Sequence, residues 1–176
     1  MLSTADREAV SSAAPPARPR LLLRPDRSGA ALLDGGWWPR SADPAAELPG
    51  LVLALDERHG LLTRVMVGTA GWDASRPRRL RVDGPAGSRV VRLGWFATMA
   101  GGLLIAISAS GGRTDLVTIP AHTSEQDARA AMEQATQDGN RDRAPAILAA
   151  IRAAATPAAG SATGRAPMPA AGRRPS

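Results

Sequence analysis

The feature that most limits the fold is a period-two alternation of residues between Leu61 and Pro120. Side chains of a strand point alternately to its two faces, so this pattern predicts half-buried β-strands. The alternating stretches are 61–67, 80–82, 90–96, 103–108 and 116–119. Glycines separate them at 84–87, 101–102 and 111–112, and paired glycines supply the positive φ of tight hairpins. Sequential hairpins predict an antiparallel meander rather than a crossover sheet.

Three segments around this region show helical spacing. The first begins with Asp43 as N-cap before Pro44 and ends near His59-Gly60, with an apolar stripe at Leu48, Leu51, Val52 and Leu55. Pro49 lies inside the stripe and predicts either a kink or a restart of the helix there. The second helix is predicted to begin at Thr123 with Gln126 as capping box, and the third covers 144–155.

An extended hairpin precedes the first helix, formed by 20–24 and by a second piece that leads into Trp37-Trp38. The predicted fold class is therefore α+β. It consists of an antiparallel meander sheet of about five to six strands with helices packed on one face. We expect one domain over residues 20–155, between a disordered tail at 1–19 and a disordered tail rich in alanine, proline and arginine at 156–176.

Composition excludes several kinds of chemistry. The chain has no cysteine, so disulfides and thiolate catalysis are absent, and two histidines are too few for a convincing zinc site. We expect no metal and no cofactor. The longest apolar stretch, Leu103–Ile107, is far too short for a membrane span, and no secretory signal is visible. These observations predict a soluble, cytoplasmic protein without a membrane partner.

The aromatic residues number only five and lie in three short strings beside Asp or Arg. An indole next to a charged residue can form a ligand pocket or an ordinary core edge, and both interpretations stay open. Trp37 and Trp38 are adjacent in a strand, so they should point to opposite faces, one into the core. The candidate contact residues for a ligand or partner are Asp34, Trp37, Trp38, Arg40, Trp72, Asp73, Arg92 and Phe96.

A second candidate surface consists of arginines on the hairpin around residue 84. These are Arg76, Arg78, Arg79, Arg81 and Arg89. A β-ribbon of this kind can follow nucleic acid phosphates, although a solvated edge that discourages edge-to-edge pairing is the commoner explanation. The net charge of +6 adds only an unspecific attraction.

Three strings together resemble a known family. They are Leu33-Asp34-Gly35-Gly36-Trp37-Trp38-Pro39-Arg40-Ser41, Ala46-Glu47-Leu48-Pro49 and Arg92-Leu93-Gly94-Trp95-Phe96. In this order they resemble an uncharacterised family of actinobacterial proteins, domain-of-unknown-function family 5994, over about residues 20–150. The resemblance implies an actinobacterial, cytosolic origin and carries no activity to these residues.

The sequence favours a non-enzymatic binding module that uses its Trp/Arg/Asp surface for a small molecule or a protein partner. The alternative is an arginine-ribbon nucleic-acid binder, with nucleic acid the less favoured partner. An enzyme comes third, because phosphate-loop, dinucleotide-glycine and Gly-x-Ser-x-Gly patterns are missing. The oligomeric state stays open between a monomer and a homodimer.

Overall fold

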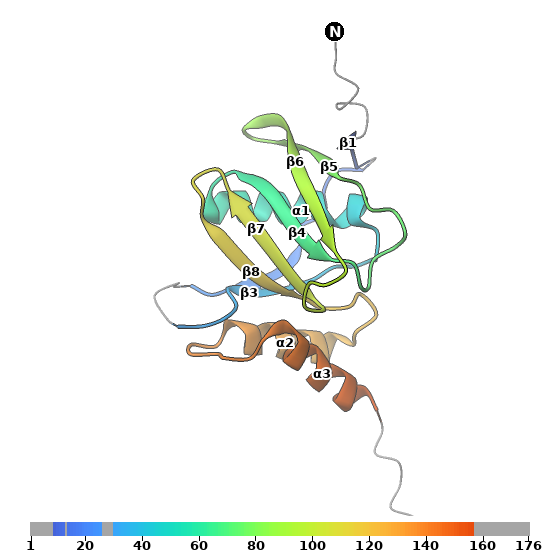
Figure 1. Ribbon diagram of the computed structural model, residues 1–176, viewed down its shortest axis with the longest axis vertical. Helices are drawn as coiled ribbons and strands as arrows, with labels where there is room; N and C mark the ends of the chain where they lie inside the picture. The colour runs from blue at the N-terminus through green and yellow to red at the C-terminus, as the bar shows by residue number, and fades with distance from the viewer. Residues whose placement is uncertain (1–8, 13, 26–29, 157–176) are drawn as a thin grey trace, which may run out of the picture.

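A computed structural model describes residues 9–12, 14–25 and 30–156 of the 176-residue chain (Figure 1). Within these residues, three helices accompany one eight-stranded mixed sheet. The strands are β1 (Ala9–Val10), β2 (Arg20–Leu23), β3 (Gly35–Trp38), β4 (Leu62–Gly68), β5 (Arg79–Gly84), β6 (Gly87–Phe96), β7 (Leu103–Ser108) and β8 (Arg113–Thr118). The helices are α1 (Pro44–His59), α2 (Glu125–Thr136) and α3 (Ala144–Ala155). The α+β class is thus confirmed.

The sheet is not the predicted meander. Its strand order is β1-β5-β6-β4-β7-β8-β3-β2, and the pairs β1–β5, β3–β8 and β4–β6 are parallel. The hairpins β5–β6 and β7–β8 form as expected from their glycine turns. However, β4 lies between β6 and β7, so the β5–β6 hairpin folds to the far side of β4. The prediction of an antiparallel sheet of five to six strands is therefore wrong.

Helix α1 follows from its local sequence. The Asp43 carboxylate accepts a hydrogen bond from the Ala45 N–H at 2.9 Å, and Pro44 occupies the first turn. Gly60 ends the helix with a φ of 79°, a conformation that glycine adopts without strain. The helix continues through Pro49, which lies beyond the first four helical positions and therefore removes one i→i−4 hydrogen bond without ending the helix.

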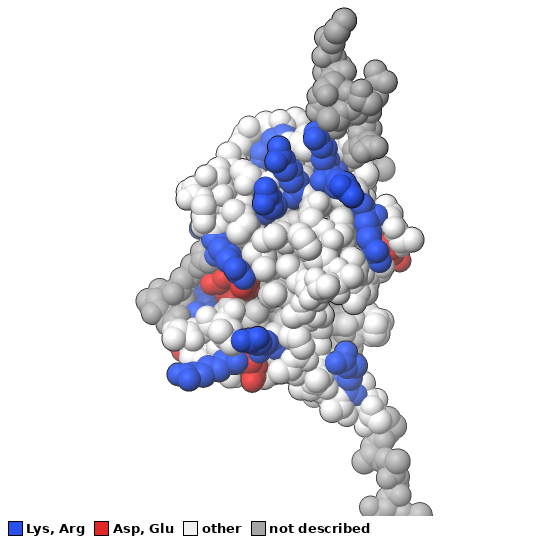
Figure 2. Space-filling model, viewed as in Figure 1, with Lys and Arg blue, Asp and Glu red and all other residues white. Residues whose placement is uncertain are grey.

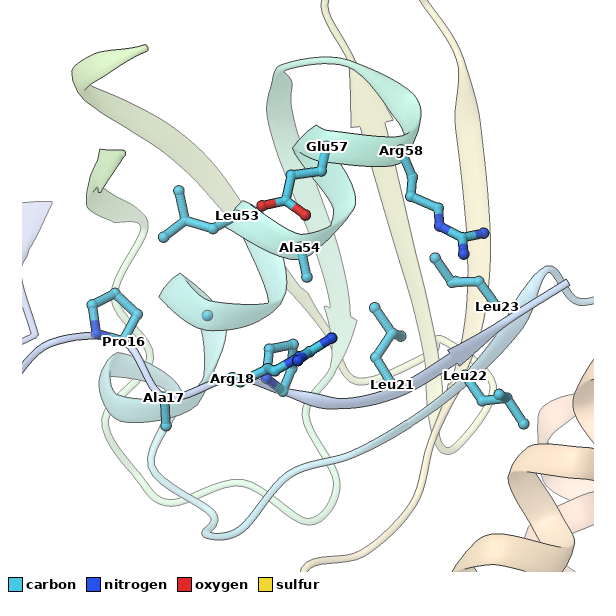
Figure 3. A pocket seen from close by; sticks show the side chains of 12 residues that line it. Pro16, Ala17, Arg18, Leu21, Leu22, Leu23, Leu53, Ala54, Glu57 and Arg58 are labelled. Carbon is cyan, nitrogen blue, oxygen red and sulfur yellow. The ribbon is translucent and has the colours of Figure 1, made fainter. Parts of the chain in front are cut away.

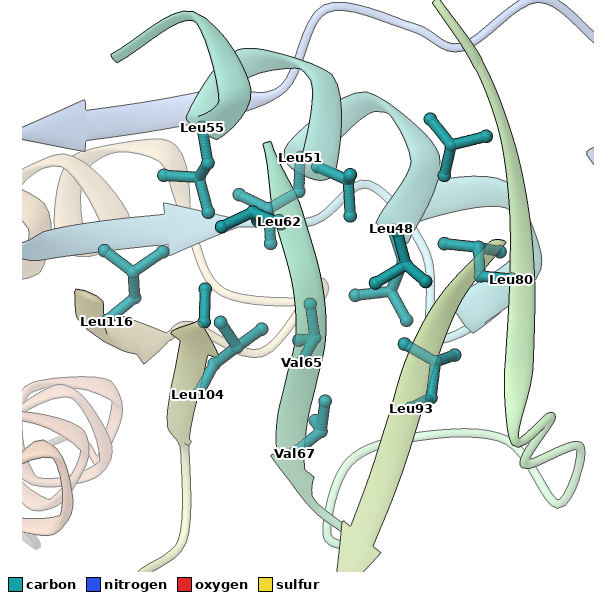
Figure 4. Close-up of a cluster of buried hydrophobic side chains, with 14 of the residues drawn as sticks. Leu48, Leu51, Leu55, Leu62, Val65, Val67, Leu80, Leu93, Leu104 and Leu116 are labelled. Atoms are coloured by element: carbon teal, nitrogen blue, oxygen red, sulfur yellow. The ribbon is translucent and has the colours of Figure 1, made fainter. Parts of the chain in front are cut away.

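The main core lies between α1 and one face of the sheet (Figure 4). The apolar stripe of α1 packs on inward residues of β4, β5, β6, β7 and β8, and Trp37 of β3 belongs to the same cluster. The members that Figure 4 labels are Leu48, Leu51, Leu55, Leu62, Val65, Val67, Leu80, Leu93, Leu104 and Leu116. Residues that alternate with these core residues along each strand, such as Arg64 and Arg92, therefore point to the opposite face of the sheet.

A second core lies on that opposite face, at the β3–β8 end of the sheet. There α2 and α3 pack on Leu33, Trp38, Val117 and Ile119. Figure 1 shows α2 and α3 below β3 and β8, with α1 behind the strands. The prediction that helices pack on one face is thus wrong, because α1 covers one face and α2 with α3 part of the other. None of the three described helices covers the outer sides of β4, β5 and β6.

Two smaller predictions also change. Ser124, not Thr123, is the N-cap of α2, and its hydroxyl oxygen accepts from the Asp127 N–H at 3.2 Å. The segment 1–19, predicted as a disordered tail, contributes β1, which pairs with β5. The remainder of that prediction, at 1–8 and 13, lies outside the described residues, as does the predicted C-terminal tail beyond Thr156.

Candidate functional site

The Trp37-Trp38 string divides between the two faces of β3, as alternation predicts. Trp37 is 0% exposed and lies in the main core with α1, whereas Trp38 is 8% exposed and lies in the second core with α2 and α3. The two indoles therefore cannot contribute to one pocket. Each is part of the interior that supports β3.

Three indoles from three strings nevertheless meet on the α1 side of the sheet. The Trp37 and Trp72 rings stack with centroids 5.6 Å apart, and Trp72 meets Trp95 edge-on at 6.2 Å. The Trp95 N–H donates to the Pro77 carbonyl at 2.9 Å, which holds the segment before β5. Trp72 and Trp95 keep part of their surface exposed. Trp37, Trp72 and Trp95 therefore form one aromatic cluster, and Trp38 lies outside it in the second core.

Trp38 pairs with a residue that the sequence did not single out. Arg20 of β2 lies opposite Trp38, and its guanidinium carbon is 3.3 Å from the ring centroid. The same guanidinium donates to the carbonyls of Trp38 at 3.0 Å and Pro39 at 2.6 Å. Burial lowers the pKa of Arg20 below its ordinary value, and the nearby Arg40 charge acts in the same direction. The guanidinium stays charged at any physiological pH.

The charged side chains on either side of β3, Asp34 and Arg40, bind backbone groups. The Asp34 carboxylate accepts from the Asp115 N–H at 2.8 Å, at the start of β3. Arg40 lies beyond the other end of β3, where its guanidinium donates to the Arg18 carbonyl at 2.9 Å. Asp34 and Arg40 therefore belong to separate hydrogen-bond networks at opposite ends of β3. Asp73 is exposed in the loop after Trp72, and its N–H donates to the Ala42 carbonyl at 3.0 Å.

The open sheet face carries Arg92 and Phe96. Arg92 of β6 pairs in register with Arg64 of β4 on one side and with Arg79 of β5 on the other. Paired residues share a face, so the three arginines form one row across three strands. Neither Arg64, Arg79 nor Arg92 forms an ion pair with any described residue.

Apolar side chains lie beside this row. Phe96 is 44% exposed, and its ring covers Gly94, where an added Cβ would lie 2.8 Å from the ring. Met66 of β4 pairs in register with Gly94. These residues line a groove of about 490 Å³ together with Arg64, Arg78, Arg79, Arg92 and Leu93. We call this groove and its residues the arginine face.

Figure 2 shows the charge distribution on this side of the molecule. Arginine side chains gather in the upper half of the view, over β4, β5 and β6, while acidic groups lie mainly toward the lower left. Arg113 of β8 pairs with Asp115 through hydrogen bonds of 2.6 and 2.8 Å. This hydrogen bond and the Asp115 charge raise the pKa of Arg113 above its ordinary value. The charge of Arg113 is thus balanced by Asp115, whereas Arg64, Arg79 and Arg92 of the arginine face form no such ion pair with described residues.

The residues of the predicted arginine ribbon lie in four different places. Arg78 and Arg79 belong to the arginine face, and Arg76 is exposed in the loop before them. Arg81 is exposed on β5 and reaches Ser88 at 3.5 Å. Arg89 points toward α1 and pairs with Asp56, so this residue is unavailable to a ligand on the outer face.

A second concavity lies away from the arginine face. It is a groove of about 490 Å³ between α1 and the chain leading into β2 (Figure 3). Figure 3 shows Leu53, Ala54 and Glu57 of α1 facing Leu21 and Arg18 across it. Its charged rim mixes Arg18 and Arg58 with Glu57, so it has no dominant charge.

The arginine face had a partial signal in the sequence. Alternation along β6 puts Arg92 and Phe96 on the side opposite Leu93 and Trp95, and the exposure of Arg92 and Phe96 agrees with this. The row itself was missed because it requires the parallel pairing of β4 with β6, which brings Arg64 beside Arg92. Alternation alone places Arg64 on a face without identifying its neighbour strand.

Comparison with known protein families places most of this domain in one of them. Residues 20–135 match a family of unknown function, DUF5994, and this range covers β2 through most of α2. The chain belongs to the DUF5994 family. No curated protein and no solved structure matches it.

The described residues of this DUF5994 protein include neither a membrane-spanning helix nor a metal-binding group. None of its described helices is long and apolar enough to cross a membrane. Among the same residues, no three His, Asp or Glu side chains are grouped so that they could hold a metal ion.

Proposed function

We propose that this protein is a binding module whose arginine face binds the phosphates of a single-stranded nucleic acid. The observation that supports this most is the row Arg79–Arg92–Arg64, in which no arginine forms an ion pair with an acidic side chain of the described residues. Guanidinium groups bind phosphate oxygens in a bidentate manner, which makes arginine the preferred residue for this ligand.

Protection of a sheet edge does not explain this row. Charged residues on edge strands discourage edge-to-edge association, but β4 and β6 are interior strands of the sheet. Like charges directly opposite each other on neighbouring strands also destabilise a sheet. Three arginines in register thus carry an electrostatic cost that a bound polyanion removes.

The apolar neighbours favour a single strand over a duplex. Phe96 exposes 44% of its surface next to the row, and Met66 lies near it. Single-strand binders combine a positive groove along the backbone with aromatic rings on which unpaired bases stack. Arg64, Arg79 and Arg92 would hold phosphates, and Phe96 would stack on one base.

The test is fluorescence anisotropy with a labelled single strand of about 16 nucleotides, the upper range of site sizes for such binders. We expect binding that weakens steeply with salt, and a triple variant with Arg64, Arg79 and Arg92 changed to Gln should lose most of it. The plot of log K against log salt should flatten by about 2 for three lost contacts. Phe96→Leu should weaken binding by about 1 to 3 kcal/mol without changing this slope.

A matched control removes equal charge elsewhere. Arg129, Arg141 and Arg143 are exposed on and between α2 and α3, and changing all three to Gln alters net charge equally. This control should retain nearly full affinity. Equal losses in both triple variants would mean unspecific attraction and overturn the proposal. Competition by polyglutamate as effective as that by the oligonucleotide would instead assign the face to an acidic protein.

A further inference from the structure

A separate cleft lies where β3, β4 and β8 end and β7 begins. Its volume is about 220 Å³, and its lining comes from the ends of these strands, the loops after them and α3. It shares no residue with the arginine face. The residues that give it chemical character are Trp72, Thr118, Leu148 and Arg152.

Most of this lining is apolar or glycine. Arg152 of α3 is the one charged residue among those that line the cleft. The volume is below the range of about 300 to 1,000 Å³ typical of drug-sized ligands, so it suits a ligand with a single ring. An apolar cleft with one cation at its side selects for an apolar body with one negative group.

Trp72 forms an aromatic wall that its neighbours hold in place. Its ring stacks on Trp37, with 29° between the planes, and meets Trp95 edge-on. Trp37 is fully buried, so this stack is anchored in the core. A ligand ring in the cleft can extend the stack, and such aromatic pairs contribute about 0.5 to 1.5 kcal/mol beyond the area they bury.

Two polar groups of the lining have no partner in the described part of the chain. Arg152 is exposed and forms no ion pair there. The Thr118 hydroxyl oxygen is buried and forms no hydrogen bond. Ser41, the other hydroxyl of the lining, is already occupied, since it donates to Glu47 at 2.9 Å. Buried polar groups normally have partners, so an unpaired hydroxyl beside a cleft needs an explanation.

From this arrangement we propose that the cleft binds a small aromatic carboxylate. Its ring lies against Trp72, and its carboxylate pairs with Arg152, since guanidinium–carboxylate pairs are strong and directional. This site is independent of the arginine face and can exist without it.

Nuclear magnetic resonance of the full chain tests the proposal with three probes. Benzoate has both the ring and the charge, benzamide lacks the charge, and cyclohexanecarboxylate lacks the aromatic ring. Benzoate should shift the indole N–H signal of Trp72, leave that of Trp38 unchanged, and bind about tenfold or more tighter than either analogue. Equal binding of all three probes would overturn the assignment, and so would an unmoved Trp72 signal.

Two variants locate the ligand. Arg152→Gln should weaken benzoate about tenfold and leave benzamide unchanged, whereas Arg143→Gln at the other end of α3 should change neither. Gly101→Leu adds bulk to the lining, and its Cβ meets no atom within 4 Å, so the fold should tolerate it while benzoate binding is lost. Unchanged benzoate affinity in both Arg152→Gln and Gly101→Leu would contradict the proposal. Both variants should retain oligonucleotide binding.

Discussion

The guanidinium carbon of Arg20 lies 3.3 Å from the ring centroid of Trp38, and Arg20 also donates to the two carbonyls at the end of β3. A cation over an indole adds about 0.5 to 2 kcal/mol, depending on how far the pair is desolvated. One side chain of β2 thereby fixes both the ring and the backbone of its neighbour strand.

The first prediction concerns this contact. Arg20→Leu should lower the free energy of unfolding by about 2 kcal/mol, because the cation–π contact and both hydrogen bonds are lost. Arg20→Lys should recover less than half, since an ammonium group cannot stack on the ring and bind two carbonyls in one plane. Urea unfolding measures both values. Arg129→Leu, on the exposed side of α2, is the control, and a loss as large as that of Arg20→Leu would refute the assignment.

The second prediction concerns the approach of α2 to β3. A Cβ added at Gly36 would lie 2.9 Å from Cγ and 3.0 Å from Cα of Met132, so Gly36→Ala must push the helix away. We expect a loss of about 1 to 3 kcal/mol in thermal or urea unfolding. Gly101→Ala is the matched control, because its Cβ meets nothing within 4 Å and its φ is not in the left-handed region. Its effect should be neutral or slightly stabilising.

Local features of the fold were predictable from sequence. The Asp43 cap, the stop at Gly60, the third helix and the hairpins β5–β6 and β7–β8 depend on residues close together in the chain. The place of β4 between β6 and β7 was not predictable in this way. It depends on which long-range pairing buries the most apolar surface, and alternation within one strand does not specify its neighbour.

In the candidate site, too, local features were predictable from the sequence and long-range contacts were not. Alternation correctly separated Trp37 from Trp38 and placed Arg92 opposite Leu93. It did not identify Arg20 as the partner of Trp38, because that contact depends on the register of β2 against β3. The arginine-ribbon interpretation, by contrast, grouped Arg89 with the outer arginines, although alternation puts it on the same face as Val91 and its side chain pairs with Asp56 of α1.

The third prediction concerns Thr118, whose buried hydroxyl has no partner among the described residues. Thr118→Val should raise the free energy of unfolding of the ligand-free protein by about 1 kcal/mol, because an unsatisfied buried polar group is removed. Differential scanning calorimetry would show this as a higher melting temperature. Thr63→Val on the exposed side of β4 is the control. It removes one exposed hydrogen bond of 3.3 Å to the Ile107 carbonyl and should not raise stability. Destabilisation by Thr118→Val would mean that the hydroxyl has a partner after all.

The fourth prediction concerns the ion pair of Asp56 and Arg89, which is mostly buried between α1 and β6. Asp56 also accepts the Leu62 N–H at 2.7 Å, so it connects the end of α1 to the start of β4. Asp56→Ala should cost about 3 kcal/mol, because it leaves the Arg89 charge buried without a partner. Asp56→Asn should cost less, since its amide oxygen still accepts from Leu62.

A double variant separates the contribution of the ion pair itself from the cost of leaving one of its charges buried without a partner. Asp56→Leu combined with Arg89→Met should recover much of the loss in urea unfolding, because replacing a buried ion pair with apolar residues is often close to neutral. Arg81→Met on β5 is exposed and should change stability by no more than about 0.5 kcal/mol. Since the Arg89 side chain faces α1, the double variant should keep the oligonucleotide affinity and salt slope of the unmodified protein. A flattened slope in this variant would mean that Arg89 contacts phosphate, and that the binding surface extends beyond the arginine face.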